Sequence, residues 1–489
     1  MGFVQLDALE RRLWNHPILA RLGHIRQLGV ASNVFPGAHH TRLSHSLGTM
    51  YYAEQLARSF LEPSDESGLG KFPDRKFVKK VRLAALLHDI GHPALSHNVE
   101  ILFIDQFKDA LNRGILGTAS TEENRLISHP VSRAVSRGRG FGIGENPFKN
   151  GTVSWYLIRK SSISKVLRDG GFDPDEIARI VAGVRGPPGS VYDQILNGGL
   201  DADKLDYLQR DSRATGVHYG SFDIAHILRS ITRFGNSMCV NERAMQACVH
   251  FTLIRYFWYS QIIYNKNLTV FEEMVKATYL ALAATHQVPS PSSMLDTLNR
   301  IGHGDMDAEQ DWCDFTDRQV LSAMESARRA LLRRAPVTDE SVMDSDTLQD
   351  FLNRVLHTRM PLTTIARIEG IDIAHSAGTG LAWDHRHPRY PQFHEFVVWL
   401  KDHHKNELDG HKIILSENFV PLIKTDDENQ IQIQTRHDTN LYSVKEHYGS
   451  LLVPIGGNDL VGLALRRVYC VDDLKSELAD KWESLLAAA

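Results

Sequence analysis

A helical apolar pattern that ends in a histidine–aspartate pair constrains the fold of this chain more than any other feature. Val78, Val81 and Ala85 recur at spacings of three and four residues, which places their side chains on one face of a helix. His88 continues that face, Asp89 follows it directly, and the glycine and proline just beyond predict that the helix stops there. The chain must therefore pack a helix whose end carries one imidazole and one carboxylate.

The histidine–aspartate pair has two interpretations. Imidazole and carboxylate are ligands for Mn, Fe, Mg and Zn, but histidines at a helix C-terminus also interact with the helix dipole without binding anything. Two further segments favour a metal: His45 lies near the start of a helix predicted over 42–60, and Asp203 lies in an apolar segment rich in carboxylates. Together with His88 and Asp89 they would form a set of two nitrogens and two oxygens with room for water. Such an open set is typical of catalytic metal sites.

The pattern changes along the 489 residues of the chain. Helical patterns dominate the first 285 residues, a polar stretch at 287–312 is typical of an insertion, and helical patterns resume after it. Beyond about residue 390, short alternating or apolar runs predict strands at 412–415, 430–434 and 450–453, and a final helix at 471–488. We therefore predict a mainly α fold in three parts: a helical core at 1–285, a helical extension with a polar insertion at 286–390, and a smaller mixed α/β region at 391–489.

Composition excludes several classes of protein. Hydrophobic residues make up 42% of the chain and its formal net charge is −4, which argues against a broadly basic nucleic-acid surface. No stretch approaches 18 consecutive apolar residues, and the N-terminus lacks a basic segment followed by an apolar one. The four cysteines are scattered without a CxxC pair, as is typical of reduced thiols. The sequence thus predicts a cytoplasmic protein with no membrane partner and no secretory signal.

Three segments of the chain resemble the motifs of a known family. They are 24–48, which contains His45, 81–100, which contains the histidine–aspartate pair, and 200–213, which contains Asp203. Their order and spacing are similar to those of the HD-domain deoxynucleoside triphosphate triphosphohydrolases, the group of the SAM- and HD-domain dNTPase and the bacterial dGTPase-like enzymes. The resemblance implies a helical HD-domain core. It also implies hydrolysis of deoxynucleoside triphosphates to deoxynucleoside and inorganic triphosphate, by water attack at the α-phosphorus.

The resemblance implies a role for each site residue. A divalent metal (Mn, Mg or Fe) would be held by His45, His88, Asp89 and Asp203. Proton transfer would fall to His92 with support from Glu100 and His129, while His97 would contact phosphate or the leaving oxygen. Phosphates would be bound by Arg42 and Lys204, and the sugar with its 3′-hydroxyl would be read by Gln27, Tyr207 and Asp211, with Leu28 against the nucleoside.

The resemblance also has consequences for partners. It implies a homo-oligomer, either a dimer or a tetramer, with deoxynucleoside triphosphates as substrates and nucleotides as effectors. Two departures from the family pattern stand out. Glu100 takes the place of an aspartate, and Asn15, Ala20 and Gly23 stand where members activated by guanine nucleotides carry Asp, Gln and Arg. The second departure implies that this regulatory site is absent or altered.

Two other functions are compatible with the same residues. An HD-type phosphodiesterase or nuclease acting on single-stranded or cyclic nucleotides would use the same metal chemistry, and it would need a wider basic groove with stacking aromatics. A sensor that binds nucleotides or nucleic acid through an inactive metal site is the third hypothesis. The intact ligand set and His92 argue against that sensor.

Overall fold

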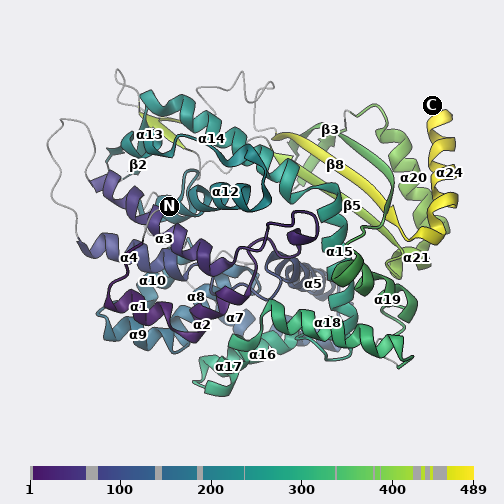
Figure 1. The fold of residues 1–489 in the computed structure, drawn as a ribbon, viewed down its shortest axis with the longest axis horizontal. Coiled ribbons are helices and arrows are strands. Elements are labelled where there is room, and N and C mark those ends of the chain that lie inside the picture. The colour runs from purple at the N-terminus through teal and green to yellow at the C-terminus, as the bar shows by residue number, and fades with distance from the viewer. Residues whose placement is uncertain are drawn as a thin grey trace. The chain divides into compact units, whose positions relative to one another are not determined.

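Helices make up most of the described chain, and two small β-sheets account for its strands, so the predicted mainly α fold with a mixed α/β C-terminal part is confirmed (Figure 1). The computed structural model describes residues 4–61, 75–137, 146–183, 191–235, 237–335, 337, 339–377, 380–385, 387–421, 431–434, 441–443 and 460–488. The chain divides into two compact units. Unit 1 comprises Met1–Cys248, Pro289–Ser322 and Glu428–Tyr442, and unit 2 comprises Val249–Val288, Ala323–Asp427 and Ser443–Ala489.

Unit 1 is an assembly of helices. They are α1 (Ala8–Trp14), α2 (Pro17–Ala20), α3 (Arg42–Leu61), α4 (Arg75–Leu87), α5 (His97–Ile115), α6 (Thr121–Ser128), α7 (Pro130–Arg137), α8 (Asn150–Lys160), α9 (Ile163–Asp169), α10 (Pro174–Val181), α11 (Val191–Asn197), α12 (Ala202–Thr215), α13 (Ile224–Arg229), α16 (Pro291–Gly302) and α17 (Met306–Asp314). Two more helices, α14 (Met245–Trp258) and α18 (Asp317–Leu332), begin in unit 1 and end in unit 2.

The centre of unit 1 is the packing of α3 against α4 and α12 (Figure 1). The predicted apolar face of α4 is buried, since Val81 and Ala85 are fully shielded and Val78 is only 8% exposed. Every residue from 81 to 87 is buried, so α4 is enclosed on all sides at its C-terminal end. This burial places the residues that follow α4 in the interior of unit 1.

A four-stranded sheet combines strands from two distant parts of the sequence. Its order is β1-β2-β6-β7, with β1 at Ile231–Phe234, β2 at Ser237–Asn241, β6 at Gln432–Gln434 and β7 at Leu441–Ser443. β2 pairs in parallel with β6, with Val240 opposite Ile433. The strand predicted at 430–434 is therefore confirmed over the residues of β6, whereas the strand predicted at 450–453 lies outside the described residues.

The polar stretch at 287–312, predicted as an insertion, contains most of two helices, α16 and α17, which the sequence did not predict. Ser290 and Asp305 cap α16 and α17, so part of the polar character reflects helix starts. Leu295, Leu298 and Ile301 of α16 are buried at helical spacing. Polar residues on the outer faces of these helices concealed that periodicity.

Unit 2 combines helices with the second sheet. Its helices are α15 (Lys266–Ala284), α19 (Ser345–Asn353), α20 (Tyr390–His403), α21 (Lys405–Asp409) and α24 (Lys475–Ala487), and its strands are β3 (Thr363–Ala377), β4 (Gly380–Asp384), β5 (Ile413–Pro421) and β8 (Leu460–Cys470). The sheet order is β4-β3-β8-β5, and all three pairs are antiparallel. Phe396 of α20, Trp482 of α24 and Ile368 of β3 belong to the apolar core of this unit. The predicted strand at 412–415 and the terminal helix are confirmed in β5 and α24.

Among the described residues, no helix combines the length and the apolar character that crossing a bilayer requires.

Candidate metal centre and active site

Three helix ends bring together the four residues predicted to bind a metal. His45 lies in the first turn of α3, and Asp203 lies in the first turn of α12. His88 and Asp89 directly follow α4, whose burial carries them inward. All four predicted ligands therefore lie at one place in unit 1.

The ligand atoms of these residues are close to one another. His45 Nε2 lies 2.9 Å from Asp203 Oδ1 and 3.9 Å from Asp89 Oδ2. His88 Nε2 lies 3.3 Å from Asp89 Oδ1 and 3.8 Å from Asp203 Oδ1. Atoms that each bind one cation at about 2.0–2.2 Å are separated from one another by distances like those measured here between the four side chains. His45, His88 and Asp89 thus form a group that can hold a metal ion, with Asp203 adjoining it.

Hydrogen bonding on the far side of the His88 ring supports the fit to a cation. Its Nδ1 lies 2.7 Å from the backbone oxygen of Ala85, a contact that requires the proton on Nδ1. The buried Nε2 atom has no hydrogen-bond partner among the described residues. It faces the carboxylates of Asp89 and Asp203, so it is placed to bind a cation together with them. The side chain of Asp203 is 36% exposed whereas that of Asp89 is 4% exposed, so the group is open on the Asp203 side.

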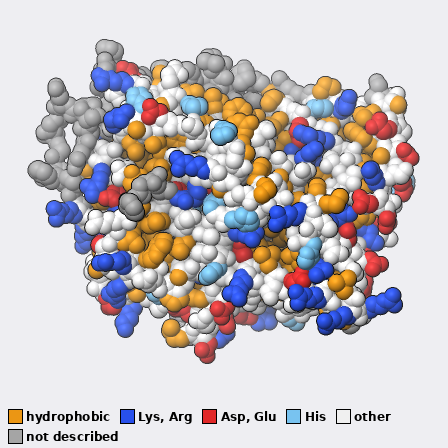
Figure 2. All heavy atoms as spheres, viewed as in Figure 1, with side chains coloured by type: hydrophobic (Ala, Val, Ile, Leu, Met, Phe, Trp, Pro, Cys, Tyr) orange, Lys and Arg blue, Asp and Glu red, His pale blue; other side chains and the backbone are white. Residues whose placement is uncertain are grey.

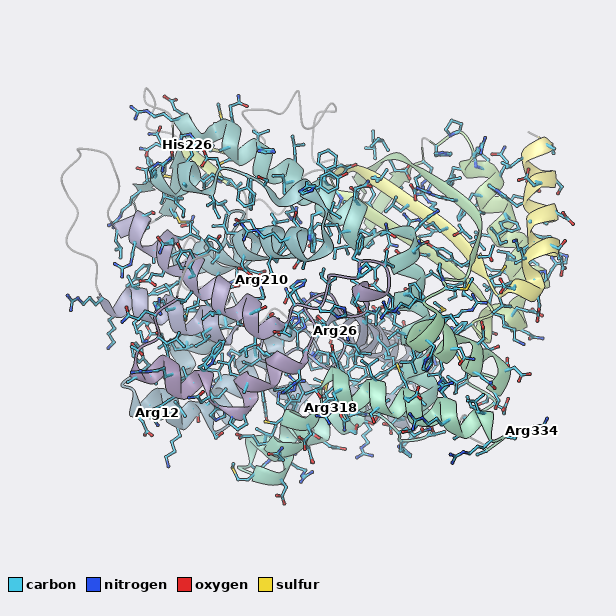
Figure 3. The ribbon with its side chains drawn as sticks, in the orientation of Figure 1. Arg12, Arg26, Arg210, His226, Arg318 and Arg334 are labelled. Carbon is cyan, nitrogen blue, oxygen red and sulfur yellow. The ribbon has the colours of Figure 1, made fainter. Side chains whose placement is uncertain are left out.

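His45 is oriented in the same way by a carboxylate. Its Nδ1 donates to Asp206 Oδ2 at 2.9 Å, and Arg210 holds Asp206 through two hydrogen bonds of 2.7 and 2.9 Å. Figure 3 shows Arg210 on α12, the helix that also carries Asp203. Burial alone would lower the pKa of His45, but hydrogen bonds with Asp203 and Asp206 raise it to about 10. Without a cation, this imidazole therefore holds a proton between two carboxylates.

Gly48 of α3 packs tightly against the side chain of Asp206, and Gly48→Ala is expected to weaken the metal site. A Cβ atom there would overlap Asp206 Oδ1 and lie 2.6 Å from Arg210 Nη2, so Asp206 would have to move away from His45. We expect the free energy of unfolding to fall by about 1–3 kcal/mol and metal affinity to fall by about 10–100-fold. Metal titration and chemical denaturation measure the two effects.

The matched control for Gly48→Ala is Gly151→Ala. A Cβ at Gly151, in the first turn of α8, meets no atom within 4 Å. This variant should keep the wild-type metal affinity. Equal losses in both variants would contradict the role given to Gly48.

A second group of titratable side chains adjoins the first. His92 Nε2 lies 3.3 Å from Asp89 Oδ1, and its Nδ1 lies 3.5 Å from Glu100 Oε2. The same glutamate oxygen is 2.6 Å from Nδ1 of His97, whose side chain is 63% exposed. Glu100 also accepts a hydrogen bond of 2.6 Å from the backbone of Asn150 at the start of α8. The two side chains are therefore close enough for the predicted pairing of His92 with Glu100.

Burial and neighbouring charges shift the pKa values of these groups. Burial raises the pKa of Asp89, but Arg42, His88 and His92 together hold it well below its usual value. Burial, aided by the positive charge of Arg42, lowers the pKa of His92 to about 4. Burial opposes ionisation of Glu100 as well, yet His92 and His97 lower its pKa to about 2. Two buried carboxylates are thus held as anions beside the imidazole of His92.

Arg42 is held by a dense set of contacts. Its side chain is 2% exposed, and it donates to Asp89 at 2.6 Å and, through Nε, to Ser96 Oγ at 2.8 Å. Its Nη2 lies 3.4 Å from the backbone oxygen of Gln27. Arg42 therefore joins the first motif to the segment that carries His97.

The remaining residues predicted to bind substrate differ in whether their polar atoms are free to contact a ligand. Gln27 is buried and its Oε1 has no hydrogen-bond partner among the described residues, and the same holds for Asp211 Oδ2. Tyr207 is buried, and Leu28 is half-buried. The Lys204 ammonium is paired with Asp201 and donates to the backbone oxygen of Gly198 at 3.0 Å. Buried polar atoms without partners are rare in native proteins, so those of Gln27 and Asp211 are consistent with ligand contacts.

His129 is directed toward a different partner. Its Nδ1 accepts a hydrogen bond from the backbone of Val131, and its Nε2 lies 3.2 Å from Asp296 Oδ1 on α16. None of the hydrogen bonds and ion pairs of the described residues joins His129 to His92 or Glu100. Support of proton transfer by His129 stays a prediction.

Sequence reasoning missed several residues that organise the site. Asp206 orients His45, Ser96 contacts Arg42, and the Nδ2 of Asn150 donates to Asp89 at 3.1 Å. His40 Nε2 lies 2.7 Å from Asp211 Oδ1. Asp206 could have been predicted from sequence as a site residue, because it lies one helical turn after Asp203. The contacts of the other three residues depend on tertiary packing.

Comparisons with known proteins agree with this geometry. Residues 42–211 match the model of the HD domain. An uncharacterized protein of Methanocaldococcus jannaschii is 28% identical over 56% of this chain and 46% of that protein. The deoxynucleoside triphosphate triphosphohydrolase SAMHD1 of Gallus gallus is 26% identical over 68% of this chain and 51% of its own length, and that of Danio rerio is 25% identical over 65% and 50%. The chain thus spans about half the length of the curated relatives it matches.

The fold has counterparts among solved structures. A hypothetical protein of Aquifex aeolicus superimposes with a TM-score of 0.63 at 19% identity, over 98% of this chain and 97% of that chain. A phosphohydrolase of Bacteroides thetaiotaomicron superimposes with a TM-score of 0.61 at 19% identity, over 96% and 97%. Residues 42–211 thus match the HD domain by sequence, and the two solved structures share the fold of the chain.

Proposed function

We propose that the protein is a metal-dependent deoxynucleoside triphosphate triphosphohydrolase. The observation that carries the proposal is the group of His45, His88, Asp89 and Asp203 beside the group of His92, His97 and Glu100, within a domain of the HD superfamily. The sequence similarity to triphosphohydrolases from vertebrates supports the choice of substrate. In this reaction the bond between the 5′ oxygen and the α-phosphorus breaks, and a water oxygen bonds to that phosphorus. The products are a deoxynucleoside and inorganic triphosphate.

The metal ligands and the second histidine group have separate tasks. A divalent cation held by the four ligands would supply positive charge for the α-phosphate and for the water that attacks it. We assign proton transfer to His92, whose ring lies between Asp89 and Glu100. We assign contact with phosphate or with the leaving oxygen to His97, because its exposed ring is accessible to a ligand. Glu100 orients both rings.

Recognition of the sugar is assigned to buried residues of the first and third motifs. Asp211 Oδ2 and Gln27 Oε1 have no hydrogen-bond partner within the described part of the chain and can accept hydrogen bonds from the 3′-hydroxyl. Tyr207, packed beneath the ribose, would disfavour a 2′-hydroxyl. Arg42 adds positive charge beside Asp89, where phosphate charge would accumulate.

The test of the proposed function is a product analysis. The chelator-stripped protein is reloaded with Mn²⁺, Mg²⁺ or, without oxygen, Fe²⁺, and is incubated with each dNTP and each rNTP in ¹⁸O-labelled water. We expect deoxynucleoside and tripolyphosphate from dNTPs, with the label only in tripolyphosphate. Asp203→Asn should remove the activity. Pyrophosphate with a nucleoside monophosphate, or label in the 5′-hydroxyl, would contradict the proposal.

The same assay separates the alternative functions. Cleavage of single-stranded DNA or cyclic nucleotides, without action on dNTPs, would indicate a nuclease or phosphodiesterase. Metal binding without any turnover would indicate a sensor. On the face drawn in Figure 2, the described Lys and Arg side chains occur in small groups separated by apolar and uncharged ones.

Removing the metal is expected to lower thermal stability. A cation present at about 100 times its dissociation constant stabilises the folded state by about 2.7 kcal/mol. The melting temperature should therefore fall with a chelator and rise again as Mn²⁺ or Mg²⁺ is titrated back. Thermal denaturation with metal analysis tests this. A melting temperature that no divalent metal changes would contradict metal binding.

A further inference from the structure

Asp317 lies far from the three motifs in sequence but contacts two of them. Its Oδ1 accepts a hydrogen bond of 2.7 Å from the backbone N–H of Leu95, and its Oδ2 accepts one of 2.9 Å from the backbone N–H of Arg26. The residue is 4% exposed and stands at the first position of α18. Each oxygen of this buried carboxylate therefore holds a different segment of unit 1. Figure 3 shows Arg26 in the segment that precedes α3.

The two segments that Asp317 holds meet again at Arg42. Arg26 precedes Gln27, and Leu95 precedes Ser96, so the held backbone positions directly adjoin site residues. Ser96 Oγ donates to the backbone oxygen of Gln27 at 3.2 Å and accepts from Arg42 Nε at 2.8 Å. His97 follows Ser96. The geometry that presents Gln27, Arg42 and His97 thus depends on these two segments staying together.

The segment at Leu95 needs such support because its backbone is strained. Leu95 and Ser96 have φ values of +58° and +59°, and neither is glycine. Residues in such conformations cost of order 1–3 kcal/mol each and persist when surrounding contacts fix them. Gly29 packs closely here, since a Cβ on it would lie 3.1 Å from the backbone oxygen of Leu95. The close approach leaves little room for the first-motif segment to shift.

Asp317 is itself fixed in place. Arg21 Nε and Nη2 donate to the backbone oxygen of Phe315 at 2.9 and 2.7 Å, and the Arg21 guanidinium stacks on Trp312 at 4.4 Å. Arg21 is 2% exposed, so this anchor is buried. Burial raises the pKa of Asp317, and hydrogen bonds from the backbone of Arg26 and Leu95 oppose that rise. The two N–H groups, together with the positive charges of Arg26 and Arg21, favour the ionised form of Asp317.

We propose that Asp317 is a positioning residue for the side of the site that binds the phosphates and the sugar, acting through the backbone of Arg26 and Leu95. The inference rests on the proposed function for its substrate. Asp317 contacts no metal ligand in the described hydrogen bonds and ion pairs, so its role concerns Gln27, Arg42 and His97. This role separates it from Asp206, which acts on a metal ligand.

The experiment compares Asp317→Asn with the wild type in the full-length, metal-loaded protein. Asparagine keeps the size of the side chain, but its NH₂ group would face one of the two backbone N–H donors and could not accept that hydrogen bond. We expect hydrogen exchange at Leu95 or Arg26 to accelerate at least about tenfold, as the loss of a hydrogen bond to a charged group implies. KM for dNTP and the dissociation constant for inorganic tripolyphosphate should rise about tenfold. Metal content should stay at the wild-type level and kcat should change less than about threefold.

Asp305→Asn is the matched control. Asp305 also accepts two backbone N–H groups, from Asp307 and Ala308, but it caps α17 and touches no site residue in the described contacts. It should leave KM and tripolyphosphate affinity unchanged. The positioning role is wrong if Asp317→Asn changes neither exchange nor tripolyphosphate affinity, if it loses metal, or if Asp305→Asn raises KM equally. If the wild type hydrolyses no dNTP, the proposed function fails, while exchange and tripolyphosphate binding still test Asp317.

Discussion

His88→Ala is expected to remove most of the bound metal and to lower kcat by more than about a hundredfold. Residues that only orient metal ligands cost about 10–100-fold when changed, and a ligand should cost more. The fold should tolerate the change, because among the described residues the His88 ring is hydrogen-bonded only to the backbone of Ala85. The free energy of unfolding of the metal-free protein should fall by no more than about 1.5 kcal/mol. Metal analysis, steady-state kinetics and denaturation of the same preparation measure all three quantities.

His303→Ala is the matched control for His88→Ala. His303 also ends a helix and bonds through Nδ1 to a backbone oxygen, that of Asn299, at 2.8 Å, but it faces solvent. It should keep the wild-type metal content and kcat. If His88→Ala retains its metal and its activity, the assignment of the ligand set is wrong.

Arg42→Ala is expected to produce the largest loss of stability. The change leaves the buried carboxylate of Asp89 without its closest positive charge, a situation that costs about 3–5 kcal/mol. The loss should be larger in the metal-free protein, because a bound cation would supply part of the missing charge. Arg42→Lys keeps the charge but cannot contact both Asp89 and Ser96 as the planar guanidinium does. We expect it to lose less stability than alanine and still to raise KM for dNTP.

A second arginine of α3 serves as the control for Arg42. Arg58 pairs with Glu54 one turn away, and its side chain is 55% exposed. Exposed pairs of this type contribute about 0.2–1 kcal/mol. Urea denaturation of Arg42→Ala and Arg58→Ala, each with and without metal, gives the comparison. Equal losses in both variants would show that Asp89 does not depend on Arg42.

Local patterns in the sequence were sufficient to predict much of the fold. The face of α4 could be predicted because Val78, Val81 and Ala85 repeat at helical spacing and end at a glycine and a proline. The segments that form β5 and α24 could be predicted from sequence in the same way. α16 and α17 were missed because their polar caps and outer faces hide buried residues such as Leu295. The strand β3 begins at Thr363, ahead of the change in texture near residue 390.

The candidate site was predictable only where its residues belong to local motifs. Family resemblance named the four predicted ligands, and the structure places their side chains close to one another. Asp317 could not be found in this way, because its two partners are separated from it by 291 and 222 residues in the chain. The direction of the His129 ring could not be predicted from sequence either, since its partner Asp296 lies on a later helix. Contacts of this kind are set by tertiary packing rather than by spacing.

The discontinuity of unit 1 has a consequence for how the protein is made. The strand β2 is complete in the nascent chain long before its parallel neighbour β6, which pairs Val240 with Ile433. Translation at about 5–20 residues per second separates these two strands by roughly 10 to 40 seconds. Asp317, too, leaves the ribosome well after the motifs that it holds. Newly synthesised chains therefore pass through a period in which the motif segments have emerged without their stabilising contacts. Chaperones would be most useful during that period, because the motif segments are then least stable.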